Sequence, residues 1–226
     1  QTCALPISNI MINLLVASDR EFQTLRTLFS TIVGVKETNY LNTIAGYYND
    51  MQISVYQIGI GKVNACTAAH YISDIEGELI SIGTCCSLTN NFKIGQPLQV
   101  CAYCQWDFDI KEGAGRCTSN FLGFQKYSTV GHKICSPFKK VVCATGDKFV
   151  TKEESKYIKE FFTAANIVDM EFGALARFFE NQRPIDGYKV VSDYANLGQY
   201  ENNWDKVTEG FKKILDYLTV GIYENN

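Results

Sequence analysis

Short apolar runs alternate with helical patterns along most of this chain. Residues 10–17 are apolar apart from Asn13, which is typical of a strand buried on both faces. After Asp19, apolar residues recur at positions 22, 25, 28 and 29, the spacing of a helix with one buried face. The sequence therefore predicts a strand followed directly by a helix in this part of the chain.

The same unit recurs further along the sequence. Residues 47–50 predict a turn between two strands, and the second strand, 53–58, ends in Gly59-Ile-Gly61 before a helical pattern over 63–72. Further strands are predicted at 79–82, 97–104 and 140–145. The first of these is expected to close on a loop of small residues, 83–87, and the last on Gly146-Asp147.

Two more helices are predicted in the second half of the chain. Thr151 and Glu154 have the spacing of a capping box, which predicts a helix over 152–162. Val190 and Val191 end the last central strand. Between 204 and 218, apolar residues recur at steps of three and four, which predicts a helix packed on the sheet.

Strands that alternate with helices predict an α/β fold, a three-layer α/β/α sandwich with a central mixed, largely parallel sheet. In such folds ligands bind at the carboxyl ends of the strands. No repeat or change in composition divides the chain, so residues 11–226 are expected to form a single domain. The first seven residues resemble a translated sequencing adapter, so residues 1–10 are interpreted as a non-native leader and the natural chain is expected to begin at or near Met11.

Composition excludes several classes of protein. Among 226 residues the formal net charge is -3 and the lysines are scattered, so the chain lacks the basic patch of a nucleic-acid-binding protein. No apolar run approaches the roughly 18 residues that span a bilayer. A secretion signal is also absent from the sequence given, and we expect a cytoplasmic protein that binds neither nucleic acid nor membrane.

The cysteines and histidines give little support for a metal site. The nine cysteines are odd in number, and Cys85 and Cys86 are adjacent, which favours reduced thiols over a disulfide framework. Cys101 and Cys104 have the C-x-x-C spacing, but in a strand an offset of three places the two side chains on opposite faces. His70 and His132 have no ligand partners nearby in sequence. No metal and no cofactor are therefore predicted.

Three acids stand at the ends of predicted strands. Glu171 and Asp193 follow apolar segments, and Glu21 follows the first strand. A buried carboxylate needs a polar partner, so either a ligand or a hydrogen-bond network should reach it. Each acid also has a purely structural interpretation: Glu171 as a helix first-turn acid, Asp193 as a turn cap and Glu21 as a solvated helix residue. Spacing alone leaves these alternatives open.

Two glycine-containing segments are also ambiguous. Gly59-Ile-Gly61-Lys-Val-Asn64 resembles a phosphate loop, but it lacks both the G-x-x-x-x-G-K-[ST] spacing and the third glycine of a dinucleotide fingerprint. A tight turn entering a helix explains it equally well. The Gly83-Thr84 pair can either bind an anion or cap the backbone.

Taken together, these motifs resemble the nucleoside phosphorylase and nucleosidase superfamily, and most of all its 5′-methylthioadenosine/S-adenosylhomocysteine nucleosidases. The matching segments are Ala17-Ser-Asp-Arg-Glu-Phe22, Ile58-Gly-Ile-Gly-Lys-Val-Asn-Ala65, Ile82-Gly-Thr84, Asp107-Phe-Asp109, Thr145-Gly-Asp-Lys-Phe-Val150, Val168-Asp-Met-Glu171 and Val191-Ser-Asp193. The resemblance runs from about Met11 to the end of the chain. It implies the phosphorylase/hydrolase-like fold and hydrolysis of an N-glycosidic bond with release of adenine.

The resemblance also implies a role for each site residue. Asp193 would protonate N7 of the leaving adenine, with Ser192 orienting it, and Glu21 would deprotonate the attacking water near Thr84. Glu171 would accept hydrogen bonds from the ribose hydroxyls. Adenine and ribose contacts would come from Phe149, which stacks on the base, from the backbone of Val150, which reads its edge, and from Met170, which packs under the sugar. The substrates implied are a purine nucleoside and water.

Two other functions stay open at the level of sequence. A phosphate-dependent purine nucleoside phosphorylase would use the same pocket, but bacterial-type phosphorylases of this superfamily carry an arginine before the glycine-hydroxyl segment, where this chain has Leu79-Ile-Ser-Ile82. Arg20 beside Glu21 keeps a phosphate route conceivable. A non-catalytic nucleoside-binding relative is the third alternative, although the presence of all three acids argues against it.

Departures from the family pattern affect the pocket and the assembly. Cys85-Cys-Ser87 and Phe172 stand where the family usually has small residues, and Ser18 replaces a larger apolar residue near the 5′ end of the substrate. The family also implies a homodimer, in which the segment 110–135 would complete the pocket of the neighbouring subunit.

Overall fold

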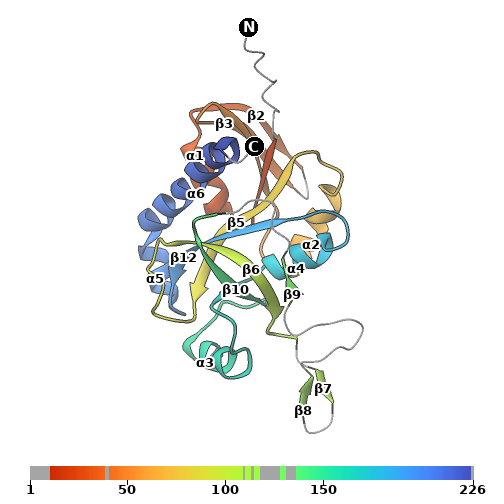
Figure 1. Ribbon diagram of the computed structural model, residues 1–226, viewed down its shortest axis with the longest axis vertical. Helices are drawn as coiled ribbons and strands as arrows, with labels where there is room; N and C mark the ends of the chain where they lie inside the picture. The colour runs from red at the N-terminus through yellow and green to blue at the C-terminus, as the bar shows by residue number, and fades with distance from the viewer. Residues whose placement is uncertain are drawn as a thin grey trace.

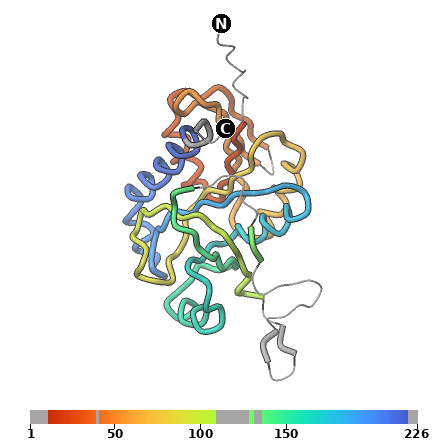
Figure 2. Tube along the Cα trace, viewed as in Figure 1, coloured from red at the N-terminus to blue at the C-terminus, as the bar shows by residue number. Residues whose placement is uncertain are grey.

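The computed structural model describes residues 11–38, 41–108, 110–112, 115–117, 128–130 and 136–224 (Figures 1 and 2). The predicted leader, 1–10, lies outside the described residues, as does most of the segment expected to complete a neighbouring pocket. No described helix combines the length and the apolar character needed to cross a membrane.

One large mixed sheet forms the centre of the molecule. Its strands run in the order β11-β10-β6-β12-β5-β1-β4-β3-β2, with β9 paired to β6. Their bounds are β1 Ile12–Val16, β2 Thr31–Glu37, β3 Asn42–Tyr48, β4 Met51–Gln57, β5 Glu78–Ser87, β6 Pro97–Gln105, β9 Ser128–Thr129, β10 Lys139–Thr145, β11 Ile167–Asp169 and β12 Asp186–Asp193. A separate pair joins β7 (Ile110–Glu112) and β8 (Gly115–Cys117).

Parallel pairing dominates the middle of this sheet. β5 is parallel to both β1 and β12, β1 is parallel to β4, and β10 is parallel to both β6 and β11. Antiparallel pairs join β12 to β6 and build the β2-β3-β4 edge. The predicted mixed, largely parallel sheet is confirmed.

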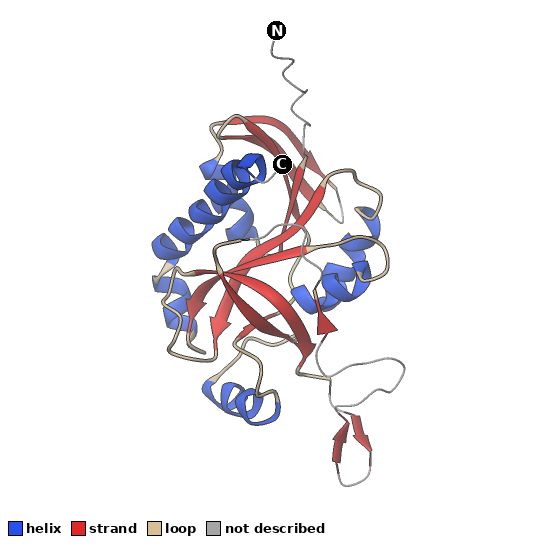
Figure 3. Ribbon diagram, in the orientation of Figure 1, coloured by secondary structure: helices blue, strands red, loops and turns tan. Residues whose placement is uncertain are grey.

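Helices cover both faces of the sheet, which gives the predicted three layers (Figure 3). Their bounds are α1 Asp19–Leu28, α2 Lys62–Tyr71, α3 Lys152–Phe161, α4 Phe172–Phe179, α5 Leu197–Asn202 and α6 Trp204–Glu224. One buried cluster joins α1 and α6 to the sheet, and a second joins α2 and α4 to the opposite face. The capping box predicted at Thr151 is present at the start of α3. A second capping box, which was not predicted, begins α1 at Ser18.

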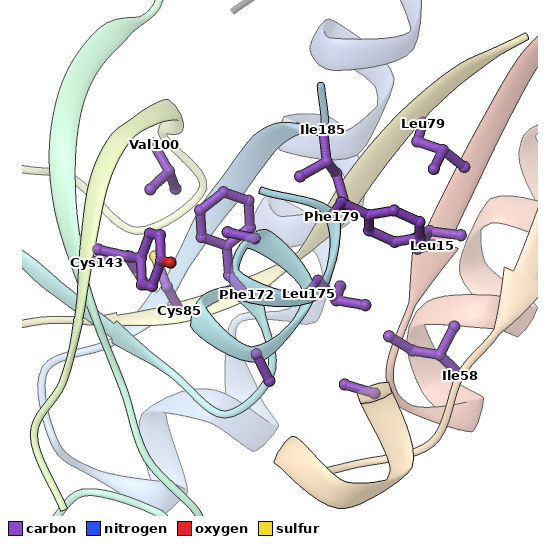
Figure 4. Close-up of a cluster of buried hydrophobic side chains, with 14 of the residues drawn as sticks. Leu15, Ile58, Leu79, Cys85, Val100, Cys143, Phe172, Leu175, Phe179 and Ile185 are labelled. Carbon is purple, nitrogen blue, oxygen red and sulfur yellow. The ribbon is translucent and has the colours of Figure 1, made fainter. Parts of the chain in front are cut away.

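Strand β1 shows why a continuous apolar run is needed at this position. Leu14 and Val16 belong to the cluster under α1 and α6, whereas Leu15 belongs to the cluster under α2 and α4. In the second cluster, Phe179 of α4 lies toward Leu15 (Figure 4). A strand covered by helices on both faces has no polar side, so the sequence loses the alternation seen in half-exposed strands.

The predicted loop at 83–87 is wrong, because β5 continues through these residues to Ser87. Gly83, Thr84 and Cys85 pair with β12, and Cys86 and Ser87 pair with β11. Small side chains in the sequence are typical of a loop. Here, however, backbone pairing with β12 and β11 extends the strand. The edge strand β2, which is largely exposed, and the short helix α5 were not predicted from the sequence.

Gly46 of β3 provides a test of the packing between α1 and the sheet edge. A Cβ atom on Gly46 would overlap the Phe29 ring and lie 2.7 Å from the Thr31 carbonyl oxygen. We expect Gly46→Ala to lower the free energy of unfolding by about 1–3 kcal/mol in urea denaturation. Gly34→Ala on β2 is the matched control, since its Cβ would meet only Ala45 at 4.0 Å. Equal stability of the two variants would contradict this packing.

Candidate active site

A cavity of about 230 Å³ opens at the carboxyl ends of β1, β5, β10, β11 and β12. Strands that run parallel end at the same edge of the sheet, so polar residues far apart in sequence meet there. All eight predicted site residues line this cavity: Glu21, Thr84, Phe149, Val150, Met170, Glu171, Ser192 and Asp193. Ala17, Ser18, Ile60, Cys85, Cys86, Lys148, Val168, Asp169, Leu197 and Tyr200 complete the lining.

Glu21 reaches the cavity from the first turn of α1 and is only 3% exposed, so it is not a solvated helix acid. One carboxylate oxygen accepts the backbone N–H groups of Ala17 (3.2 Å) and Ser18 (3.0 Å), which closes the capping box of α1. The other oxygen accepts both the backbone N–H (2.7 Å) and the hydroxyl (2.9 Å) of Thr84. Four donors thus hold this carboxylate in one orientation at the cavity wall.

An irregularity at the end of β12 sets the direction of the Asp193 side chain. Its register against β5 shifts between Val191 and Asp193, and such bulges re-aim side chains next to functional sites. The Asp193 carboxyl accepts the Asn196 backbone N–H at 3.2 Å and lies 2.9 Å from the Ser192 hydroxyl oxygen. Burial raises the pKa of Asp193 against these hydrogen bonds, which lower it.

The Ser192 hydroxyl indicates where a proton on Asp193 can lie. Its oxygen is within reach of two acceptors, the Asp193 carboxyl and the Cys85 carbonyl oxygen at 3.0 Å. A hydroxyl has one proton to donate. When Asp193 is protonated, Ser192 can accept that proton's hydrogen bond and donate its own to Cys85, so both groups are satisfied.

Glu171 stands at the N-cap position of α4, but its side chain makes no capping bond. Instead one carboxyl oxygen accepts the backbone N–H of Gly61 at 2.9 Å. Burial, together with the nearby Asp169, raises the pKa of Glu171 to about 8, while Lys189 and the Gly61 N–H act in the opposite direction. The interpretation of Glu171 as a simple first-turn acid is therefore insufficient.

The Gly59–Lys62 segment proves to be a wall of this site. Gly59 and Gly61 have φ values of 80° and 91°, which favour glycine, and they turn the backbone so that Gly61 faces Glu171. Lys62 fixes the turn from outside: its ammonium lies 2.6 Å from Asp107 and its backbone N–H donates to Asp147 at 2.7 Å. The segment thus binds the carboxyl group of Glu171. Asp109, the second acid of the Asp107-Phe-Asp109 motif, lies outside the described residues.

Aromatic and apolar groups close the rest of the cavity. Phe149 is 39% exposed at the rim and meets the ring of Tyr200 edge-on at 6.0 Å, whereas Val150 is buried. Cys86 lies on β5 beside Asp193, and its sulfur accepts the Ala195 backbone N–H at 3.1 Å. Tyr200 and Cys86 were missed as site residues, because neither a lone tyrosine in a short helix nor a thiol inside an apolar strand carries a sequence signal.

Positive charge at the cavity is limited. None of the arginines that the structure describes lines it. Arg20 instead stacks on Trp204 at 4.1 Å and donates to the Glu201 carbonyl oxygen at 3.3 Å. Lys148 lines the cavity but pairs with Glu154. The described residues also contain no group of His, Cys, Asp and Glu that could hold a metal ion.

Comparison with known proteins gives consistent matches. Residues 12–218 match the model of the phosphorylase superfamily. A 5′-methylthioadenosine/S-adenosylhomocysteine nucleosidase of Buchnera aphidicola is 29% identical over 71% of this chain and 82% of that protein. Among solved structures, the nucleosidase of the same name from Neisseria meningitidis superposes with a TM-score of 0.76 at 18% identity, covering 92% of this chain and 98% of that one. The futalosine hydrolase of Helicobacter pylori gives 0.77 at 19% identity, covering 93% and 97%.

The raised pKa of Glu171 predicts a pH-dependent stability. Folded Glu171 keeps its proton up to about pH 8, whereas its ordinary value is 4.5. Its contribution to stability is therefore complete below about pH 4.5 and is lost as the pH rises toward 8. We expect the melting temperature of the unsubstituted protein to fall relative to that of Glu171→Gln across this range, by on the order of 10 °C. Exposed Glu153→Gln should follow the unsubstituted protein, and parallel curves for all three proteins would contradict the shift.

Proposed function

Because this chain belongs to the phosphorylase superfamily, we propose that it hydrolyses the N-glycosidic bond of 5′-methylthioadenosine or S-adenosylhomocysteine and releases adenine. The observation that carries this proposal is the arrangement of Glu21, Glu171 and Asp193 around one cavity whose described lining includes no arginine. The relatives with this activity by name add support.

Asp193 acts on the leaving base in this proposal. Cleavage of the glycosidic bond leaves negative charge on adenine, so a proton delivered to N7 lowers the barrier. Such a donor must hold a proton near neutral pH. Burial raises the pKa of Asp193, and the Ser192 hydroxyl is placed to accept a hydrogen bond from it.

Glu171 acts on the sugar. Ribose becomes cation-like as the bond breaks, and a carboxylate that accepts hydrogen bonds from its hydroxyls binds that state more tightly than the ground state. The Gly61 N–H occupies one oxygen of Glu171, so the other is the one we assign to the ribose. Met170, the preceding residue in the cavity lining, packs under the sugar.

Glu21 deprotonates the attacking water on the opposite side of the ring. Thr84 donates two hydrogen bonds to the same carboxylate oxygen, which orients it at the cavity wall and sets Thr84 next to the water. Phe149 at the rim stacks on adenine, and the backbone of Val150 reads the edge of the base.

Water is favoured over phosphate as the nucleophile. A phosphate dianion needs convergent cations, and arginine binds it best because its guanidinium forms two parallel hydrogen bonds. Arg20 is turned toward Trp204, and the cavity's Lys148 is paired with Glu154. Hydrolysis is therefore the reaction we assign.

We further propose a cytoplasmic homodimer. Cys66, Cys85, Cys86, Cys101, Cys104 and Cys143 are free thiols, in keeping with a reducing compartment. Ile60 of the cavity lining (52% exposed) and Val63 (76%) and Tyr71 (54%) of α2 expose apolar side chains, which a second copy would cover.

The reaction is tested by base release with and without phosphate. Methylthioadenosine, S-adenosylhomocysteine, adenosine and inosine are incubated with the protein in both buffers, and the base and the sugar product are identified. We expect adenine and free methylthioribose in phosphate-free buffer. A sugar 1-phosphate formed only with phosphate would indicate a phosphorylase, and no product in either buffer would indicate the non-catalytic relative.

Substitution of Asp193 tests the acid. We expect Asp193→Asn to lower kcat by about 10²- to 10⁴-fold, the usual contribution of a general acid, while binding of intact nucleoside changes little. Asp205→Asn, an exposed acid in the first turn of α6, is the matched control and should keep full activity. Full turnover by Asp193→Asn would remove this residue from the acid role.

A further inference from the structure

Lys189 is a buried cation to which the proposed reaction gives no role. It lies in the middle of β12, between Tyr188 and Val190, and its side chain is only 3% exposed. A lone ammonium at such a position would be costly to desolvate, so it needs a partner. That partner is Asp169 at the end of β11, whose carboxylate lies 2.7 Å from the ammonium and is 1% exposed.

Asp169 connects this ion pair to the start of α4. The oxygen that meets Lys189 also accepts the Phe172 backbone N–H at 2.8 Å. Its second oxygen accepts the Thr145 hydroxyl at 2.6 Å, and the oxygen of that hydroxyl accepts the Gly173 backbone N–H at 2.8 Å. Two N–H groups of the first turn of α4 are thus fixed by a chain of contacts that begins at Lys189.

Glu171 is the residue that this first turn carries into the cavity. It stands between Asp169 and Phe172 in the sequence, at the N-cap position of α4. The contacts on either side of it leave its backbone little freedom. Lys189 therefore acts on the position of Glu171 through Asp169, without lining the cavity itself.

Lys189 also faces the second acid of the site. A Cβ atom placed on Gly83 would lie 3.1 Å from a carboxylate oxygen of Glu21 and 3.5 Å from the Lys189 ammonium nitrogen. The two groups therefore approach the same point of β5, which is open only because residue 83 has no side chain. This explains a glycine inside the central strand, where glycine otherwise weakens pairing.

We propose that Lys189, through its ion pair with Asp169, is a positioning residue that holds Glu171 in place for binding of the ribose and favours its ionised form. The proposal rests on the proposed function, because it assigns Lys189 to the same site.

The charged groups around Glu171 come from several elements. Asp169 of β11 and Glu21 of α1 disfavour its ionised form, as burial does, whereas Lys189 of β12 favours it. Asp169 also accepts the thiol of Cys143 on β10 at 3.3 Å. Burial raises the pKa values of this thiol and of Cys85 on β5.

On the far side of the Gly61 turn, Lys62 is paired with Asp107 and Asp147. Lys189 is thus the cation that acts most directly on Glu171 among the described groups. The pKa of Lys189 itself is raised by Asp169 and Glu171 in spite of burial, so it stays charged at neutral pH.

Substitutions of the two partners should act in opposite directions. Lys189→Met removes the cation, so Glu171 should bind its proton more tightly and the acidic limb of the kcat/KM–pH profile should move to higher pH. A move of one unit lowers kcat/KM about tenfold below the limb. Asp169→Asn removes a repelling anion and frees Lys189 to pair with Glu171, so the limb should move to lower pH. Lys189→Arg keeps the charge and should hold the limb within about half a unit of its original position.

A purely structural ion pair would give a different result. Both single substitutions would then lower activity by a constant factor at all pH values, with the limb unmoved, and this outcome would overturn the proposal. If Lys189→Met does not fold, the double variant Lys189→Met with Asp169→Asn replaces it, since it removes both charges together. Its limb should lie at higher pH than that of Asp169→Asn alone, and equal limbs would also overturn the proposal.

Melting temperature measured against pH separates this proposal from the proposed function, because it needs no turnover. Above about pH 7, Lys189→Met should lose stability more steeply than the unsubstituted protein, because its Glu171 keeps the proton to a higher pH, and Asp169→Asn should lose stability less steeply. If no nucleoside is hydrolysed but these slopes differ as stated, the proposed reaction is wrong and the link from Lys189 to Glu171 stands. Equal slopes would remove the link, whatever the activity.

Discussion

The parallel pairing of β5 with β1 on one side and β12 on the other is the constraint on which the rest of the structure depends. Parallel strands end at the same edge, so residues that follow β1 and β12 are brought to the residues in the second half of β5. Glu21 meets Thr84 in this way, and Asp193 meets Cys86. The cavity is a consequence of strand direction before any side chain is considered.

Local signals in the sequence were sufficient for much of the fold. Capping-box spacing marked α3, and apolar runs marked β1, β4, β6 and β10, because these patterns arise from burial and hydrogen bonding within a few residues. The extension of β5 from Gly83 to Ser87 depends instead on pairing with strands that lie more than 70 residues away in the sequence. A pattern within a few residues cannot indicate such pairing. Edge strand β2 was missed because its apolar residues Ile32, Val33 and Val35 are interrupted by Gly34 and do not alternate with polar residues, and most of its side chains are exposed.

The sequence predicted which acids line the candidate site, but it did not predict the buried ion pair beside them. Family motifs indicated the acids of the cavity, while Lys189 stood unnoticed inside an apolar strand. A lysine flanked by Tyr188 and Val190 in a strand covered on both faces is in fact a signal, because a charge there requires a buried partner. Its partner, Asp169, lies in a matching motif segment, yet only the structure brings the two within 2.7 Å.

Of the four buried acids that line the cavity, three are accommodated in different ways: Glu21 by four hydrogen-bond donors, Asp169 by a buried lysine, and Glu171 by a raised affinity for its proton. The double use of Glu21 has an evolutionary consequence. The same carboxylate completes the capping box at the start of α1 and faces the cavity, so a mutation that removes the proposed catalytic base also removes this helix cap. Drift toward an inactive binding protein through residue 21 would therefore carry a folding penalty, and selection for folding alone would help to retain the acid.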